Sequence, residues 1–134
     1  ESIQDECKIM PKAKILAHTS FAYEPLYFTK APIFAIEKVL KISGLDIKDI
    51  DLFEINEAFS CVPMVAIDKL KLDYDKVNIH GGAVSLGHPI GASGTRILVT
   101  LLNALKIRKV KYGIASICIG GGEASAMIIE NYDL

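Results

Sequence analysis

The last two apolar segments of the chain, residues 111–120 and 123–131, are separated only by Gly121 and Gly122. Two strands joined by so short a connection must run antiparallel, because a parallel crossover needs about a dozen residues or more. The two segments therefore predict a β-hairpin, and they fix the direction of the last strand relative to the strand before it.

Upstream of the hairpin, strand-like and helical patterns alternate. Apolar runs at residues 13–21 and 50–56 predict strands, and residues 77–84 begin as a shorter one. Between these runs, apolar residues recur at the spacing of helices that bury one face. The positions expected to face the core are Ile33, Ile36 and Leu40, then Phe59, Val62, Ala66 and Leu70, and finally Leu98, Leu101 and Leu105. We predict one α/β layered domain with a mostly parallel sheet, helices packed on the sheet and the antiparallel C-terminal hairpin at its edge.

Composition excludes several classes of partner. The 134 residues carry a net charge of -1, so no excess of basic residues points to nucleic acid or to an anionic membrane. No apolar run approaches the roughly 20 residues of a membrane span. The spacing of Cys7, Cys61 and Cys118 suits neither a disulfide framework nor a zinc site, and it favours a reducing intracellular compartment. The chain begins with Glu1 rather than Met, so we expect a piece of a longer protein.

Three polar side chains follow the predicted strands. Asn56 ends the second strand, His88 lies in the loop after the third, and Cys118 lies near the end of the first hairpin strand. In α/β sheets, polar chemistry collects where strands end and loops begin. We therefore expect Asn56, His88 and Cys118 to meet at one rim of the sheet.

Each of these residues also has a purely structural interpretation. Asn56 and Glu57, in the segment NEAF, can cap the following helix, or the Asn56 amide can be a fixed donor to an oxyanion or an ordered water. His88 can be an ordinary histidine and Cys118 a small core residue. Three glycines that follow Cys118 after one residue favour chemistry, because glycine weakens a strand and because the Gly120 N–H can then reach a substrate oxygen.

The segment GGAVSLGHPIGASGTR, residues 81–96, surrounds His88 with glycines and leads into a helix. Glycines permit the close approach of a backbone or ligand, and Pro89 fixes the chain beside the imidazole. The helix N-terminus adds the positive end of a dipole, which favours a developing anion or a thiolate. The segment matches neither GxxxxGK[ST] nor GxGxxG after a strand, so nucleotide binding is the weaker alternative.

Taken together, the segments NEAF (56–59), GGAVSLGHPIGASGTR (81–96) and CIGGG (118–122) resemble the thiolase family, in the family's order. The resemblance covers nearly the whole chain from about residue 12. The segment AYEPLYFTKAPIFA (22–35) is further similar to the mitochondrial-type acetoacetyl-CoA thiolases.

The resemblance implies a role for each candidate residue. Cys118 matches the acid/base cysteine that removes a proton from the methyl group of acetyl-CoA or returns it, and we expect the imidazole and the helix N-terminus to lower its pKa. His88 matches the histidine that activates the nucleophilic cysteine and helps hold the thioester oxygen. Asn56 matches the asparagine that positions a water in that oxyanion site, and Gly120 supplies an N–H to a second one. In potassium-dependent members, the carbonyl at the position of Val84 contacts the ion.

The resemblance also implies the reaction and the partners. We expect the C-terminal catalytic part of an acetyl-CoA C-acetyltransferase, which interconverts two acetyl-CoA with acetoacetyl-CoA and CoA and requires no cofactor beyond these thioesters, with a potassium ion in some members. The alternatives are a longer-chain 3-ketoacyl-CoA thiolase and a non-catalytic acyl-CoA-binding or assembly module. The expected partners are an N-terminal thiolase domain and further copies in a homodimer or homotetramer. A mitochondrial location is favoured over a cytosolic one.

One departure from the family pattern limits what the chain can do alone. The family's nucleophilic cysteine belongs to the N-terminal half, and neither Cys7 nor Cys61 lies in a matching context. We further expect residues 1–134 to be a thiolase C-terminal domain that lacks its first strand and its N-terminal domain. The chain by itself is therefore predicted to be inactive.

Overall fold

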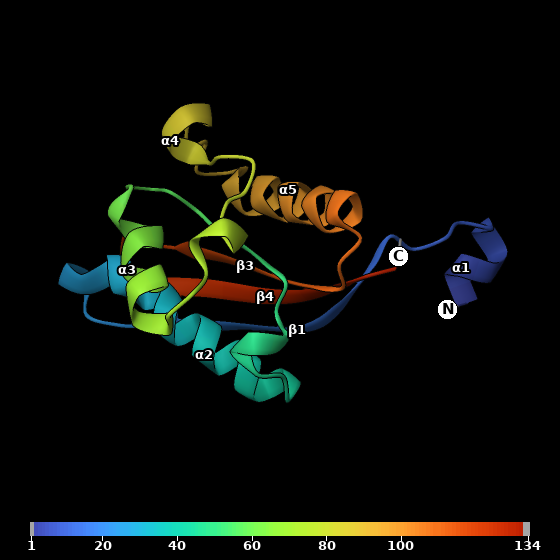
Figure 1. Ribbon diagram of the computed structural model, residues 1–134, viewed down its shortest axis with the longest axis horizontal. Helices are drawn as coiled ribbons and strands as arrows, with labels where there is room; N and C mark the ends of the chain where they lie inside the picture. Colours follow the sequence, from blue (N-terminus) through green and yellow to red (C-terminus); the bar gives the residue numbers. More distant parts are fainter. Residues whose placement is uncertain (1, 133–134) are drawn as a thin grey trace.

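The computed structural model describes residues 2–132, in which a four-stranded sheet carries helices on both faces (Figure 1). The strands are β1 (Ala13–Ala22), β2 (Leu52–Ile55), β3 (Tyr112–Cys118) and β4 (Glu123–Asn131). The helices are α1 (Ser2–Cys7), α2 (Ala31–Ser43), α3 (Cys61–Leu70), α4 (Ala83–Leu86) and α5 (Ser93–Arg108), with the 3-10 turns η1 (Pro25–Lys30), η2 (Ile47–Asp49) and η3 (Tyr74–Lys76). The α/β layered architecture predicted from the sequence is confirmed.

The sheet has the strand order β1-β4-β3-β2. β2 pairs in parallel with β3, and β4 pairs antiparallel with both β3 and β1. Three strands therefore point the same way, and the C-terminal hairpin is present as predicted. The hairpin is not at the edge, however, because β1 pairs with β4 from Ala13 opposite Asn131 to Ala22 opposite Glu123. β4 is thus an interior strand, and the antiparallel edge predicted from the sequence is formed by β1 pairing with β4, not by the hairpin itself.

The short strand expected at residues 77–84 is reduced to a single bridge between Val77 and Phe53. The extended conformation ends directly afterwards, because Asn78 has a φ of 49° and Gly81 a φ of 80°. The Asn78 side chain instead completes the outer edge of β2. Its Oδ1 accepts from the Ile55 N–H at 2.8 Å, and its Nδ2 donates to the Ile55 carbonyl at 2.9 Å.

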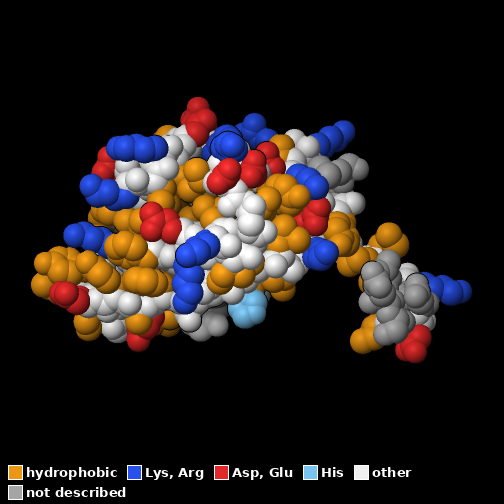
Figure 2. Space-filling model, turned by 90° about the horizontal axis from the view of Figure 1, so that it is seen from below, with side chains coloured by type: hydrophobic (Ala, Val, Ile, Leu, Met, Phe, Trp, Pro, Cys, Tyr) orange, Lys and Arg blue, Asp and Glu red, His pale blue; other side chains and the backbone are white. Residues whose placement is uncertain are grey.

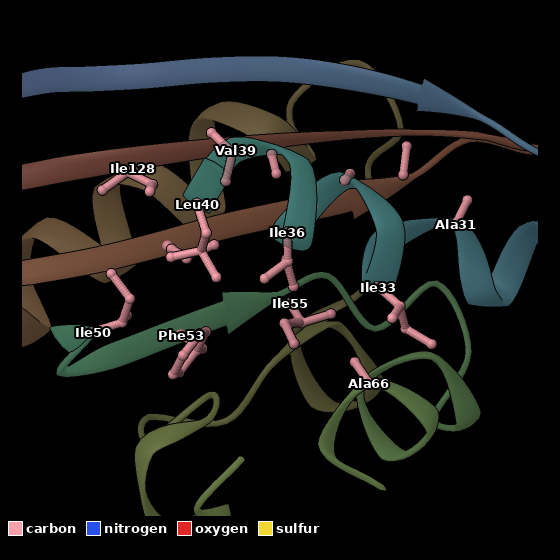
Figure 3. Packing of buried hydrophobic residues seen from close by; sticks show 14 of the residues in the cluster. Ala31, Ile33, Ile36, Val39, Leu40, Ile50, Phe53, Ile55, Ala66 and Ile128 are labelled. Carbon is pink, nitrogen blue, oxygen red and sulfur yellow. The ribbon is translucent and has the colours of Figure 1, made fainter. Parts of the chain in front are cut away.

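The main core lies between the sheet and α2. Ile33, Ile36 and Leu40 are buried, as their helical spacing predicts. Figure 3 shows Ile36 and Leu40 reaching from α2 toward the strands, where Ile55 lies close to Ile36. Each such side chain, fully buried, contributes about 1.5–3 kcal/mol of transfer free energy. This face therefore anchors the strands that carry the candidate residues.

α3 continues the same layer, but only part of its predicted stripe is buried. Val62 and Ala66 are fully buried and Leu70 is half-buried. Phe59 is 59% exposed, because it precedes the first turn of α3 and points away from the core. The expectation that Phe59 faces the core was therefore wrong.

α5 covers the opposite face of β2 and β3, with Leu101 and Leu105 buried and Leu98 half-buried against it. α5 extends little over β4, and a cavity of about 470 Å³ opens there. Its lining comes from β1, the start of α5, β3 and β4. This side of the sheet is thus only partly covered by the chain's own helices.

The two ends of the molecule have different surfaces. α1 protrudes from the body, as Figures 1 and 2 both show. At the other end, where η1 lies, hydrophobic side chains gather on the surface (Figure 2), and Leu26 is 79% exposed there. Among residues 2–132, none of the helices has the length and apolarity needed to cross a membrane.

Candidate active site

The rim of the sheet where β2 and β3 end carries the candidate residues. Ile55 lies opposite Ser116 in the parallel pair, and the Asn56 N–H donates to the Ser116 carbonyl at 2.9 Å. The ladder thus continues one residue beyond β2, and it delivers Asn56 to the edge where β3 ends at Cys118. This is the position expected of a site in an α/β sheet.

A cavity of about 410 Å³ opens at this rim. Its lining residues, drawn from separate segments of the chain, are Phe28, Ala58, Phe59, His88, Ile90, Ile117, Cys118, Ile119 and Gly120. Asn56 is fully buried behind the cavity, with its Nδ2 at 3.5 Å from His88 Nδ1. The structure therefore brings together Asn56, His88, Cys118 and Gly120.

Val84 is the expected residue that does not join them. It lies in α4 and is 68% exposed. Its N–H donates to Glu57 Oε2 at 2.9 Å, and its side chain does not line the cavity.

Hydrogen bonds around His88 favour one tautomer. His88 Nδ1 lies 2.5 Å from Ser93 Oγ, and Ser93 Oγ donates to the Pro89 carbonyl at 3.1 Å. A hydroxyl has a single proton, so if Ser93 donates it to Pro89, Ser93 accepts from an Nδ1–H. Nε2 of His88 is left with its lone pair, which is the state needed to accept a proton. The Asn56 amide faces an N–H in this tautomer, so its own donors remain available to another acceptor.

Glu57 organises the glycine loop. Its Oε1 accepts from Asn78 Nδ2 at 3.2 Å, and its Oε2 binds the first turn of α4. A Cβ at Gly82 would lie 2.5 Å from the Glu57 carboxyl carbon, so a larger residue there would displace the carboxylate from these hydrogen bonds. The interpretation that Glu57 caps the following helix is thus wrong, because its carboxylate binds the first turn of α4 and not of α3. The side chain of Asn56 binds other side chains, and it caps no helix.

Burial raises the pKa of the Cys118 thiol, and the nearby Cys61 raises it further. A backbone hydrogen bond opposes these effects but does not outweigh them. The expectation of a lowered pKa was therefore wrong, because the thiol lies at the edge of the apolar core and is 6% exposed. Cys118 is held as a neutral thiol at pH 7.

The glycines after Cys118 have different structural roles. Gly122 has a φ of 102°, and a Cβ there would lie 2.3 Å from the Tyr23 carbonyl oxygen. Its own carbonyl accepts from the Tyr23 N–H at 2.8 Å, so the end of β1 requires this glycine. A Cβ at Gly120, in contrast, would meet nothing within 4 Å. Only Gly120 thus opens space beside the cavity.

Three polar residues of the site were missed in the sequence. Glu54 is 2% exposed on β2, and its Oε2 lies 3.8 Å from Nη1 of Arg96 on α5. Burial raises the pKa of Glu54 to about 7, against the opposing effect of Arg96, and Glu57 adds to the rise. Ser93, the third, binds His88. The signal that could have found Glu54 is a carboxylate inside the otherwise apolar run LFEI.

Within residues 2–132, no group of three or more His, Cys, Asp or Glu side chains is placed to hold a metal ion.

Comparisons with known proteins identify the family. The sequence matches the family described as "Thiolase, C-terminal domain" over residues 9–131. An acetyl-CoA acetyltransferase of Rattus norvegicus, named as mitochondrial, is 54% identical over 123 residues, which are 92% of this chain and 28% of the rat protein.

Solved structures of thiolases match the fold of this chain. The Acat5 thiolase of Ascaris suum in complex with coenzyme A matches with a TM-score of 0.90 and 47% identity, over 97% of this chain and 34% of that chain. Human mitochondrial 3-ketoacyl-CoA thiolase matches with a TM-score of 0.96 and 39% identity, over 98% of this chain and 34% of that chain.

The fold is that of a thiolase C-terminal domain, and the chain belongs to the thiolase family. Several of its relatives are named acetyl-CoA acetyltransferase, which is an acyltransferase. The chain spans only about a third of the length of the proteins it matches.

Proposed function

We propose that the chain is the C-terminal catalytic part of an acetyl-CoA C-acetyltransferase. The reaction joins two acetyl-CoA to give acetoacetyl-CoA and CoA, or runs in reverse. The observation that carries the proposal is the cavity shared by His88, Cys118 and Gly120, with Asn56 against the imidazole of His88. The relatives named acetyl-CoA acetyltransferase support this choice of substrate.

Cys118 exchanges the proton on carbon. In condensation the Cys118 thiol first gives its proton to the CoA thiolate that leaves when the nucleophilic cysteine is acylated. The Cys118 thiolate then removes a proton from the methyl group of a second acetyl-CoA, and the resulting carbanion attacks the acyl carbon held as a thioester on the nucleophilic cysteine. The nucleophile's sulfur leaves as a thiolate. In cleavage the neutral Cys118 thiol returns the proton to the departing carbon. Burial, which raises the pKa of Cys118, favours this proton-donating state at neutral pH.

The other three groups stabilise charge and move a second proton. His88, with the Nε2 lone pair, accepts the proton of the nucleophilic thiol. The Asn56 NH₂ group holds a water that donates to the thioester oxygen as it becomes an enolate. The Gly120 N–H donates to the oxygen of the acyl-enzyme. One such preorganised donor is worth about 3 kcal/mol of barrier.

The proposal includes an N-terminal thiolase domain that supplies the nucleophilic cysteine. The cavity of about 470 Å³ beside α5, at the partly covered face of the sheet, supports this partner. We use the term assembled thiolase for this chain together with such a domain, on one polypeptide or on two. The chain alone is expected to be inactive, and the assembled thiolase is expected to be a homodimer or homotetramer. That the domain lacks a first strand stays a prediction.

The proposal includes one candidate ligand of a potassium ion, the backbone carbonyl of Val84. α4 is a single helical turn, so its last carbonyls have no partner within the helix and its C-terminal end is negative. Carbonyl oxygens of this kind suit a monovalent cation. Potassium bound there would stabilise the loop that carries His88, and replacing potassium by sodium in the assay would reveal it.

A longer-chain 3-ketoacyl-CoA thiolase is the second candidate. The specific observation in its favour is the likeness of fold to the human mitochondrial 3-ketoacyl-CoA thiolase. Names among the relatives include mitochondrial and cytosolic forms. We propose a mitochondrial location, because the segment at residues 22–35 is similar to the mitochondrial type.

The test is thiolysis by the assembled thiolase of acetoacetyl-CoA and of 3-ketoacyl-CoA with about six to ten acyl carbons. We expect acetoacetyl-CoA to be preferred and Cys118→Ala to lower kcat by about 10²–10⁴-fold, the usual contribution of general acid–base catalysis. Cys7→Ala, at an exposed thiol on the protruding helix α1, is the matched control and should keep wild-type kcat. A preference for the longer substrates would favour the second candidate. CoA binding without turnover would favour a non-catalytic module, and turnover by the isolated chain would contradict the need for a second domain.

A further inference from the structure

The proposed reaction leaves a buried ion pair beneath the site without a role. All four residues of β2 are buried, and Glu54 among them is a carboxylate. Arg96, whose side chain is 21% exposed, faces it from the first turn of α5. Enclosing a carboxylate in this way costs several kcal/mol unless the charge is well paired. At 3.8 Å between Nη1 and Oε2, the pair is long, so simple mutual stabilisation does not account for it.

Alternation along the strand explains why Glu54 meets α5. Leu52 packs with Ile97 on the α5 side, whereas Phe53 packs on the α2 side. Glu54 lies two residues after Leu52, and Asn56 continues the ladder two residues later. Side chains two residues apart on a strand share a face. One guanidinium on α5 can therefore reach both.

Arg96 determines which way the Asn56 amide points. Its Nη2 donates to Asn56 Oδ1 at 3.3 Å. A guanidinium can only donate and stays charged, so it binds the oxygen of an amide and not the NH₂ group. The NH₂ group must then point the other way, and it lies 3.5 Å from His88 Nδ1. Without this donor, the two nearly isosteric ends of the amide could exchange places.

We propose that Arg96, held by Glu54, is a positioning residue that keeps the donor end of the Asn56 amide toward His88 and the cavity. Among the described residues, Glu54 Oε1 and the Nε and Nη1 atoms of Arg96 make no hydrogen bond. The hydrogen bond that the guanidinium does make goes to Asn56. The kinetic consequence of this role rests on the proposed function, whereas the orientation of the amide does not.

Steady-state kinetics of the assembled thiolase test whether Arg96 positions the Asn56 amide. Arg96→Gln removes the positive charge and the guanidinium N–H groups. Arg96→Lys keeps a positive charge beside Glu54 but loses the separate N–H group that donates to Asn56. We expect kcat to fall about 10–100-fold in both variants, with KM within about twofold, because the oxyanion donor is misplaced. Arg108→Gln, at the exposed end of the same helix, is the matched control and keeps wild-type kcat. Arg96→Lys serves as the test if Arg96→Gln does not fold.

The decisive comparison is made in an Asn56→Ala background. Because Arg96 acts through Asn56, adding Arg96→Lys there should lower kcat no further. A merely structural role would instead multiply the two losses. Multiplied losses, or wild-type kcat in the Arg96 variants, would overturn the proposal.

Orientation can also be followed without turnover, by ¹⁵N NMR of the same protein. We expect Arg96→Lys to speed exchange of the Asn56 NH₂ protons with water by at least about tenfold and to shift the imidazole nitrogens of His88. Arg108→Gln should change neither. Unchanged Asn56 signals in Arg96→Lys would overturn the positioning role even in an active enzyme. Changed signals in an inactive wild type would refute the thiolase function and leave the positioning role standing.

Discussion

At the scale of single residues, the candidate site consists of polar side chains that are buried in an apolar sheet, where burial costs free energy. Asn56 is fully buried, Glu54 nearly so, and Cys118 is 6% exposed. Each meets the cost of burial differently. The Asn56 side-chain oxygen accepts from Arg96 and its backbone N–H donates to the Ser116 carbonyl, whereas burial raises the pKa of both Cys118 and Glu54. Burial among the strands thus shifts the protonation of Cys118 and Glu54 toward the neutral form.

The raised pKa of Glu54 predicts how stability depends on pH. Folded Glu54 titrates at about 7 and its ordinary value is 4.5, so between these values the folded state holds more of its proton than the unfolded state. The contribution of Glu54 to the free energy of unfolding therefore falls as pH rises through this window, by about 3 kcal/mol in total. It is constant below pH 4.5 and above the folded pKa.

This contribution is measured as the difference between wild type and Glu54→Gln in urea unfolding from about pH 4 to about pH 8. A glutamine side chain at this position cannot titrate, so the other carboxylates cancel in the difference, whatever constant offset the substitution adds. A difference that does not change across this range would show that the pKa of Glu54 is not raised.

At the scale of elements, connections rather than strands determine the site. The hairpin turn is pinned by β1 through Gly122, and the glycine loop is pinned by Glu57 against Gly82. Each contact joins segments far apart in the sequence. The loops are thus positioned by specific close approaches and not by their glycine content alone.

Gly122→Ala should destabilise the chain by at least about 2 kcal/mol, because it adds a Cβ at positive φ and against a backbone oxygen. Gly91→Ala is the control, since a Cβ at Gly91 meets nothing within 4 Å and φ is not positive. Urea unfolding of both variants gives the comparison. Equal midpoints would mean that the turn shifts away from Tyr23 without cost.

Sequence patterns predicted the helices and strands well wherever one face is buried. The spacing of Ile33, Ile36 and Leu40 and the two glycines of the hairpin are local signals, and both were correctly interpreted. The interior place of β4 was missed because it depends on pairing with β1, about a hundred residues away in the chain. The contact of Arg96 with Asn56 was missed for the same reason, since no local pattern records which side chains meet across layers.

At the scale of the whole molecule, the chain's own helices cover one face of the sheet more completely than the other. α2 and α3 close one face over the larger core cluster, whereas α5 leaves part of the other face open over β1 and β4. An open apolar cavity on a sheet is typical of a surface that another domain covers. The asymmetry agrees with a chain that spans only about a third of its relatives.

Cysteine labelling can locate the covering domain. Ser20→Cys lies at the open cavity, and Lys41→Cys lies on the exposed side of α2. In the assembled thiolase we expect maleimide to modify position 20 at least about tenfold more slowly than in the chain alone, because a covered thiol is reached only through local opening. Position 41 should react at the same rate in both. Equal rates at position 20 would place the second domain elsewhere.

The interior position of β4 has a consequence for biosynthesis. β1 and β3 are not hydrogen-bonded to each other, and among the described strands β1 pairs with β4 alone. Within this sheet β1 therefore has no strand to pair with until β4 has been synthesised, about a hundred residues later. A strand exposed for so long is a target for chaperones and for pairing with other nascent chains.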